Sequence, residues 1–268
     1  MTNDYLIFNR AQVKQHRARA AAFIEGHFLL EELSVRMGDR LLDMTRTFPS
    51  VLNLGCHNGV LAAHLPERCG VETLVQADMS EAMVRSANGL QVVADEEFLP
   101  FAPASFDLVI SVFSLQWVND LPGCLIQINR ILKPGGLFIA MMPGGESLTE
   151  LRQSFEVAEM ATRGGISPRI SPFLDGRDGA NLLQRAGFVL PVCDSEMLHV
   201  MYEHPLKLLQ DLRAGGQGNA LISGAKHISR RDMFAAMADY YLRTFSVNGR
   251  VTASCDIVTL TGWKKDAG

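Results

Sequence analysis

Two glycines that enclose a short loop are the first residues in this sequence whose spacing could do chemistry. The loop, Gly55-Cys56-His57-Asn58-Gly59, directly follows an apolar run. Glycine lets a ligand approach the backbone without a Cβ in the way, and a helix after the loop would offer unpaired N–H groups. His57 stands at the third position, so the loop lacks the G-x-G-x-x-G pattern of dinucleotide binding. A plain strand-to-helix turn is the competing interpretation.

Acidic residues follow the next two apolar runs. Asp78 lies 19 residues after Gly59, where a carboxylate could accept both hydroxyls of an adenosine ribose or, alternatively, cap a helix. Asp95 and Glu96 follow the next run, where a side chain can meet an adenine edge. A solvated acidic loop is the alternative there, and for Glu97 it is the interpretation that we prefer.

The elements that must position these residues follow from the apolar runs. Strands are predicted at residues 51–54, 73–77, 90–94, 106–113 and 137–142, with further strands within 188–202 and 251–263. Strands joined by helical crossovers indicate a parallel sheet covered on both faces, with ligands at the carboxyl ends of the strands. We therefore expect an α/β fold with a doubly wound, mostly parallel, seven-stranded Rossmann-like sheet, N-terminal helices and late helical insertions.

The length of 268 residues, with 47% hydrophobic and 20% charged residues, fits one large globular domain. Residues 1–47 are expected to form a helical segment packed on the core, and residues 48–268 the main domain, with helical decoration at about 146–187 and 204–246. The net charge of −4 offers no basic excess for nucleic acid. No apolar run approaches the ~18 residues of a transmembrane segment.

Cysteine usage and the start of the chain bear on location. The five cysteines form no C-x-x-C pair, so neither a disulfide framework nor a zinc site is expected, and a reducing compartment suits them. The first eight residues lack the pattern of a secretory signal. The basic stretch at residues 10–19 is interpreted as a domain helix rather than an organelle transit sequence. A cytoplasmic location is the resulting expectation.

Together, the loop and the acids resemble the class I S-adenosylmethionine-dependent methyltransferases, which carry a glycine-rich loop after strand one and acids after strands two and three. Phe106-Asp107-Leu108-Val109 and Leu132-Lys133-Pro134-Gly135-Gly136 match further motifs of that superfamily. The resemblance covers about residues 48–145 and implies S-adenosyl-L-methionine as the cofactor and methyl transfer as the activity. The residues it implies for cofactor binding are Asn53, Gly55, Cys56, His57, Gly59, Asp78, Met79, Asp95, Glu96 and Ser111.

Two of these positions depart from the superfamily pattern. Asn53 stands where an acid is usual, and His57 stands where a glycine is usual. Asn53 keeps a carbonyl oxygen for hydrogen bonding but loses charge assistance. His57 adds bulk, and a positive charge when protonated. Both departures predict weaker cofactor binding.

Methyl transfer depends on alignment and a dry pocket more than on a fixed catalytic group. We therefore predict no catalytic residue and no metal, and an acceptor that is a small molecule or a protein. Trp117 is as easily a core residue as a wall of the substrate pocket, and capping a helix is the better interpretation of Glu146. The candidates on the substrate side are Gln116, Trp117, Met142 and Glu146.

A narrower resemblance spans nearly the whole chain. Segments 94–101, 114–122, 144–152, 170–173, 185–188 and 261–264 are similar to the family of mitochondrial respiratory complex I assembly factor 5 and its bacterial relatives. The malonyl-carrier-protein methyltransferase of biotin synthesis is a more distant cousin. The resemblance implies the methyltransferase fold and, for the mitochondrial member, hydroxylation of an arginine in a complex I subunit.

The activity prediction is therefore an S-adenosylmethionine-dependent methyltransferase of unknown acceptor. The alternatives are an arginine hydroxylase and a non-catalytic assembly factor for respiratory complex I, with a complex I subunit as partner. None of the seven histidines forms the H-x-D or H-x-E segment of an iron facial triad, which favours methyl transfer. The loop at residues 163–177 carries arginines beside apolar residues and is either a client-binding loop or a solvated one.

Overall fold

A mixed sheet with the order β3-β2-β1-β4-β5-β8-β6 forms the centre of the molecule, and the short strand β7 pairs with β8. The computed structural model describes residues 6–23, 27–224 and 230–266. Strands β1 to β5 are parallel, whereas β8 runs antiparallel to both β5 and β6. The strands are Ser50–Leu54 (β1), Thr73–Asp78 (β2), Leu90–Val93 (β3), Phe106–Val112 (β4), Leu132–Pro143 (β5), Phe188–Tyr202 (β6), Ser246–Val247 (β7) and Arg250–Lys264 (β8).

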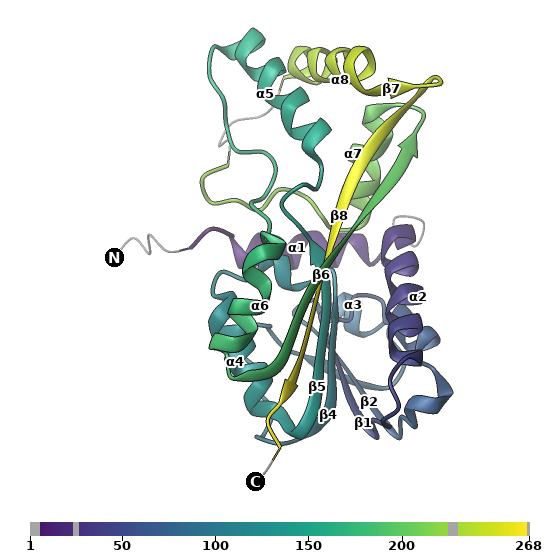
Figure 1. Ribbon diagram of the computed structural model, residues 1–268. Helices are drawn as coiled ribbons and strands as arrows, with labels where there is room; N and C mark the ends of the chain where they lie inside the picture. The colour runs from purple at the N-terminus through teal and green to yellow at the C-terminus, as the bar shows by residue number, and fades with distance from the viewer. Residues whose placement is uncertain (1–5, 24–26, 225–229, 267–268) are drawn as a thin grey trace.

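Helices cover both faces of this sheet, as Figure 1 shows. The expected doubly wound fold is thus confirmed, with β7 as an addition that the sequence did not indicate. The helices are Arg10–Ala20 (α1), Phe28–Leu42 (α2), Glu81–Val84 (α3), Leu121–Ile131 (α4), Thr149–Arg163 (α5), Gly176–Arg185 (α6), Pro205–Ala214 (α7) and Arg231–Phe245 (α8), and the 3-10 helices are Val60–His64 (η2), Glu67–Cys69 (η3) and Leu115–Trp117 (η4). Among the described residues, no helix combines the length and the apolar character needed to cross a membrane.

The strand residues alternate between two apolar layers. Val51 and Leu108 pack with α2 on one face, while the adjacent Leu52 and Val109 pack with α4 and α6 on the other. A side-chain period of two in the strands explains why these runs are apolar throughout, since both faces of the sheet are buried. The register of β1 between β2 and β4 brings the carboxyl ends of the parallel strands to one edge.

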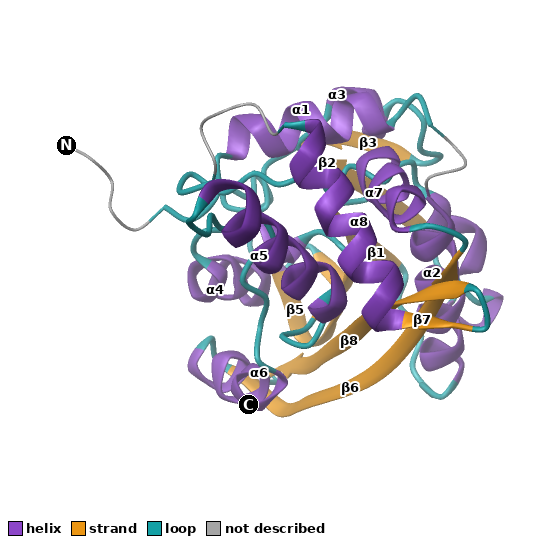
Figure 2. Ribbon diagram, turned by 90° about the horizontal axis from the view of Figure 1, so that it is seen from above, coloured by secondary structure: helices purple, strands orange, loops and turns teal. Residues whose placement is uncertain are grey.

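Strands β6 and β8 extend well beyond the sheet as a two-stranded ribbon, each 15 residues long. The ribbon carries α5, α7 and α8, which form the upper part of the molecule in Figure 1 and lie over one end of the sheet in Figure 2. This helical lobe has its own apolar cluster, which includes Phe155, Met237 and Tyr241. The late helices are therefore a packed layer on the extended strands.

Helix α1 runs across the carboxyl ends of the parallel strands, between the sheet and the helical lobe (Figure 1). Asn9 caps it by accepting a hydrogen bond from the backbone N–H of Gln12. Its buried residues are Val13, Arg17 and Ala20. An arginine on the buried face of a helix requires partners within the protein, and these partners define the candidate site.

Candidate functional site

The glycine loop and the acidic residues predicted from the sequence meet at the carboxyl ends of β1, β2 and β3. The backbone N–H groups of Gly55 and Cys56 donate to the carbonyl oxygen of Ala77, at 2.7 and 2.9 Å, which fastens the loop to the end of β2. Asp78 is the last residue of β2 and has no exposed surface. Its carboxylate accepts backbone hydrogen bonds from His57 and from Ser80, at 3.2 and 2.8 Å.

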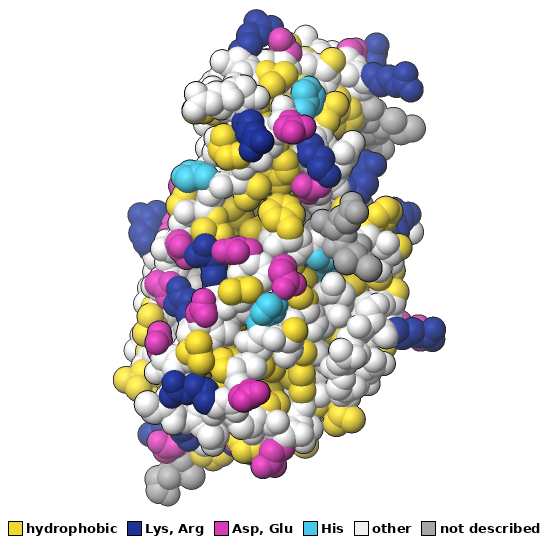
Figure 3. All heavy atoms as spheres, turned by 90° about the vertical axis from the view of Figure 1, so that its right-hand side faces the viewer, with side chains coloured by type: hydrophobic (Ala, Val, Ile, Leu, Met, Phe, Trp, Pro, Cys, Tyr) yellow, Lys and Arg dark blue, Asp and Glu magenta, His cyan; other side chains and the backbone are white. Residues whose placement is uncertain are grey.

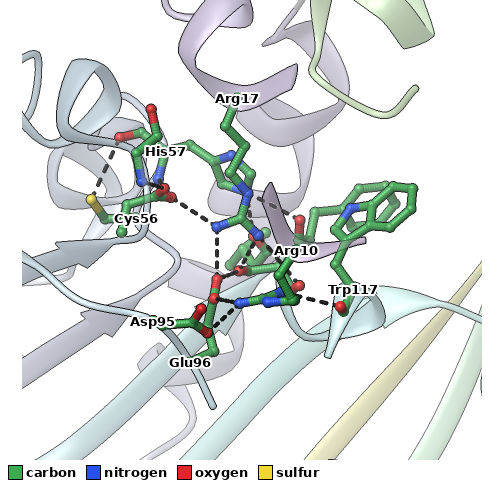
Figure 4. A network of polar contacts seen from close by, with 12 residues as sticks. Arg10, Arg17, Cys56, His57, Asp95, Glu96 and Trp117 are labelled. Atoms are coloured by element: carbon green, nitrogen blue, oxygen red, sulfur yellow. Dashed lines mark hydrogen bonds and ion pairs between the residues drawn. The ribbon is translucent and has the colours of Figure 1, made fainter. Parts of the chain in front are cut away.

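Arg17 of α1 lies between the acids at this edge, as Figure 4 shows. Its Nη1 atom is 3.2 Å from Oδ2 of Asp78 and 2.7 Å from Oε1 of Glu96, and its Nη2 atom donates to Oγ of Ser114 at 2.7 Å. The side chain of Arg17 is 2% exposed, and those of Asp78 and Glu96 are fully buried. The guanidinium thus holds acceptor positions that the hydroxyls of a nucleoside would otherwise use.

A second arginine of the same helix extends the cluster. Nη2 of Arg10 contacts both Asp95 and Glu96, and its Nη1 atom donates to the backbone oxygen of Trp117 at 3.1 Å. We call Arg10, Arg17, Asp78, Asp95 and Glu96 the ion cluster. Two positive charges face three negative ones within it.

The ion cluster sets the charge state of its members. Burial alone would raise the pKa of Glu96, but the charges of Arg17 and Arg10 outweigh burial and hold that pKa at about 2. Burial opposes the charge of Arg17 too, yet Asp78 and Glu96 raise its pKa above the ordinary value. Glu96 and Arg17 are therefore both charged at neutral pH. Removal of one member would leave a buried charge without compensation, which costs about 3–5 kcal/mol in comparable proteins.

Gly55 is required here by close packing. It has a φ of +70°, and a Cβ built on it would lie 1.9 Å from Oγ of Ser114 and 3.3 Å from Oε1 of Glu96. Gly59 also has positive φ (+79°), and a Cβ there would meet Ala87 at 2.6 Å. In this arrangement the space beside Gly55 is filled by protein atoms.

His57 fills the loop position that is glycine in the superfamily. Its φ is +49° and its side chain is 3% exposed. Nε2 lies 3.1 Å from the backbone oxygen of Phe113 and therefore carries the proton, while Nδ1 is buried without a hydrogen-bond partner among the described residues. Burial, with the charge of Arg17 as the next cause, lowers the pKa of His57 to about 4. The imidazole is thus neutral at pH 7.

The remaining predicted cofactor residues lie close by, but several of them face protein partners. Nδ2 of Asn53 donates to Oε1 of Gln76 in β2 at 2.8 Å, and Cys56 is buried beside α3. Met79 packs in an apolar cluster with residues of the N-terminal segment, Val13 among them. Ser111 is buried in β4, and its hydroxyl has no partner among the described residues.

The four substrate-side candidates do not gather at one point. Gln116 and Trp117 both donate to Oε1 of Gln217, at 3.1 Å each. Met142 lies in the sheet core, 1% exposed. Glu146 is exposed and precedes α5, whose N-cap is Leu148, so the structure does not show the capping role.

Arg10, Arg17 and Ser114 are the site residues that sequence reasoning missed. A signal for the arginines exists, because Arg10, Val13, Arg17 and Ala20 follow the three- and four-residue spacing of one helix face. This spacing predicts that the four residues share a buried helix face. Arginines on a buried face need acidic partners that are also buried. Among the described residues, no group of three or more His, Cys, Asp or Glu side chains is placed to hold a metal ion. His227 lies outside those residues.

The buried neutral His57 should make stability sensitive to acid. Between pH 6.5 and 4 the unfolded chain binds a proton at this residue that the folded chain does not, so stability falls as the pH falls. The loss between pH 7 and pH 4.5 should be about 2 kcal/mol larger in the wild type than in His57→Asn, because asparagine tolerates positive φ and does not titrate. Urea unfolding at both pH values measures this difference, and equal losses in the two proteins would contradict it.

Comparisons with known proteins place the chain in a family. A model described as a methyltransferase domain matches residues 52–140. A mitochondrial arginine-hydroxylase NDUFAF5 of Danio rerio is 38% identical, covering 96% of this chain and 83% of that protein. A malonyl-[acyl-carrier protein] O-methyltransferase of Methylovorus sp. is 31% identical, covering 100% of this chain and 93% of that protein.

A solved structure supports the same fold. Phosphoethanolamine N-methyltransferase 2 of Haemonchus contortus, in complex with S-adenosylhomocysteine, superposes with a TM-score of 0.52 at 17% identity. The match covers 86% of this chain and 53% of that protein. Since similarity at this identity shows the fold alone, the reaction has to be argued from the site.

The expected cytoplasmic location is wrong on this comparison. The NDUFAF5 relatives are named as mitochondrial proteins, which contradicts that expectation. The cysteine pattern could not distinguish these compartments, because it indicates only that the thiols stay reduced. The matched domain and relatives support an enzyme of the methyltransferase class, and the chain belongs to the NDUFAF5 family within the class I S-adenosylmethionine-dependent methyltransferase superfamily.

Proposed function

We propose that this protein binds S-adenosylmethionine at the crevice of the ion cluster and transfers its methyl group to an acceptor. The observation that carries the proposal is the buried carboxylate of Asp78 at the end of β2, beside the Gly55 loop and next to Glu96. Acids in these places match the ribose and adenine contacts of doubly wound nucleotide-binding folds. The methyl group of S-adenosylmethionine is already activated, so the protein has to bind it, orient it and exclude water.

The residues do not accommodate the nucleoside in the arrangement described. Arg17 occupies the acceptor oxygens of Asp78 and Glu96, and Ser114 fills the space against Gly55. The buried Nδ1 of His57 is the polar atom of the loop without a partner among the described residues. Cofactor binding therefore requires α1 to withdraw Arg17, and the energy of the ion cluster opposes binding.

A double variant tests this competition. Arg17→Ala/Glu96→Ala removes the competing guanidinium together with one of the two acids that it compensates, and Asp78 keeps the backbone N–H donors of His57 and Ser80. We expect it to bind S-adenosylhomocysteine at least about tenfold more tightly than the wild type, or ~1.4 kcal/mol, by titration calorimetry. Adding Asp78→Ala should then weaken binding by ~1–3 kcal/mol through lost ribose hydrogen bonds.

Lys14→Ala is the matched control for that experiment. Lys14 lies on the exposed side of the same helix, so its removal deletes a positive charge without touching the ion cluster. Its affinity for S-adenosylhomocysteine should equal that of the wild type. No heat from the double variant at millimolar ligand, in a protein that still unfolds cooperatively, would refute the nucleoside site.

Arginine hydroxylation is the second candidate, and one observation favours it. The acids of the crevice bind two guanidinium groups of the chain itself, Arg10 and Arg17, which supports a site complementary to arginine. The NDUFAF5 relatives are named arginine-hydroxylases. On this candidate the partner is a protein such as a respiratory complex I subunit, and a non-catalytic assembly factor would bind the same partner without changing it.

Mass analysis of a client protein separates these activities. Incubation with S-adenosylmethionine in air, with a two-electron reductant added, should add about 14 Da to the acceptor if a methyl group replaces a hydrogen, and hydroxylation by dioxygen and the reductant would instead add about 16 Da. We expect the methyl increment, and we expect it to require the added cofactor. An increment of 16 Da would replace the proposed activity by hydroxylation, and an unchanged client that binds the protein would favour the assembly factor.

A further inference from the structure

A large cavity lies on the other side of α1 from the ion cluster. It encloses about 920 Å³ between α1, the start of α2, the helical lobe and the ends of β4 and β5. Helix α1 contributes His16, Ala18 and Arg19 to its wall, whereas Arg10 and Arg17 face the ion cluster. Known ligand sites have volumes of about 300–1,000 Å³, so this cavity is large enough for a small molecule.

Apolar side chains dominate the cavity wall. Trp117 and Phe113 line it at the end of the sheet, and Leu151, Leu208 and their neighbours line it in the helical lobe. Figure 3 shows hydrophobic side chains gathered on one face between the lobe and the sheet. The aromatic residues of the wall are Phe23, Phe28, Phe113, Trp117, Phe155, Phe173, Tyr202 and Phe234.

All the charged side chains of the wall are basic. Arg19, Arg169 and Arg213 line the cavity together with His16, and among the described residues no Asp or Glu belongs to the lining. Arg19 and Arg213 are exposed, and among the described residues neither has a carboxylate within ion-pair distance. Both charges act on His16, whose pKa is lowered first by burial and then by Arg19 and Arg213. Two arginines without acidic partners therefore gather at one end of an apolar cavity.

We propose that this cavity binds a single anionic amphiphile, a carboxylic acid with a long aliphatic chain. The chain lies along the aromatic and aliphatic wall, and the carboxylate lies at Arg19 and Arg213. Burial of the aliphatic chain supplies the affinity, and the two arginines favour a ligand with a negatively charged head group. The proposal does not rest on methyl transfer, because no member of the ion cluster belongs to the cavity lining.

An enclosed space between two layers favours one molecule over a membrane surface or a protein chain. A membrane or protein partner would be recognised by an open apolar face. Here the wall is contributed jointly by α1, the helical lobe and the ends of β4 and β5, so the space lies between layers of the molecule rather than on one face. The mouth carries Phe23 and Phe28, which are 56% and 42% exposed.

Calorimetry with fatty acids tests the proposal. We expect the full-length protein to bind dodecanoate with 1:1 stoichiometry, below the concentration at which it forms micelles. Across hexanoate, octanoate and decanoate to dodecanoate, the affinity should rise about threefold per methylene, as expected for burial of each CH₂. Dodecanol, with the same chain and no charge, should bind at least about fivefold more weakly than dodecanoate.

Two variants separate the head-group contacts from the wall. Arg19→Ala/Arg213→Ala should weaken dodecanoate binding about tenfold and leave dodecanol binding unchanged. Leu212→Trp adds volume inside the wall and should weaken both ligands, while its unfolding transition by circular dichroism stays cooperative. Lys14→Ala removes one charge from α1 outside the lining and should bind dodecanoate as the wild type does.

The outcomes that overturn the proposal are distinct from those that overturn the nucleoside site. Failure of the wild type to bind dodecanoate, or binding of dodecanol as tight as that of dodecanoate, would refute an anionic amphiphile. Heat from phosphatidylglycerol vesicles without heat from free dodecanoate would replace the small molecule by a membrane surface. Titration of S-adenosylhomocysteine tests the nucleoside site with a ligand that lacks a long aliphatic chain, so absence of binding at one site does not imply absence of binding at the other.

Discussion

The mutual burial of Arg17, Asp78 and Glu96 is the interaction on which the arrangement of the site depends. Three charges that are almost wholly removed from water are tolerated because each is hydrogen-bonded to an opposite charge. The cluster joins the first helix to the ends of strands that lie far apart in the sequence. It also explains why Gly55 and Ser114 pack so closely, since Ser114 donates and accepts within the same group.

Helix α1 has opposite chemistry on two of its faces. One face presents Arg10 and Arg17 to acids, and the other presents Ala18 and Arg19 to an apolar cavity. A displacement of α1 that frees Asp78 would also alter the wall of that cavity. The helix is therefore the element that separates an acidic, polar crevice from an apolar, basic space, and any ligand of one acts on the boundary of the other.

The sequence predicts the sheet well because its strands are buried on both faces and are separated by turn residues. The acids at Asp78 and Glu96 could also be placed from the chain alone, since the carboxyl ends of parallel strands share an edge. The partner of those acids could not be identified in that way. Arg17 lies 61 residues from Asp78, and no local pattern encodes which acid a buried arginine reaches.

Two further features differ from what the sequence indicates: the helices at the strand ends and the length of strands β6 and β8. The helix expected after the glycine loop is the 3-10 helix η2, and the helix after Asp78 is the four-residue α3; the loop before η2 is fastened to β2 by the N–H groups of Gly55 and Cys56. The length of the ribbon was also not apparent. The alternation of buried and exposed side chains along β6 and β8 continues past the sheet. There the buried side chains pack in the apolar cluster of the helical lobe.

That ribbon has a mechanical consequence. Strands β6 and β8 pass from the main sheet into the helical lobe without a break, and their register is unbroken from Val192–Thr261 to Tyr202–Val251. A continuous antiparallel ladder resists bending far more than a single-chain linker does, so the lobe cannot swing away like a hinged cap. Access to the enclosed spaces must instead come from shorter, separately attached pieces of chain, of which the first helix is the best placed.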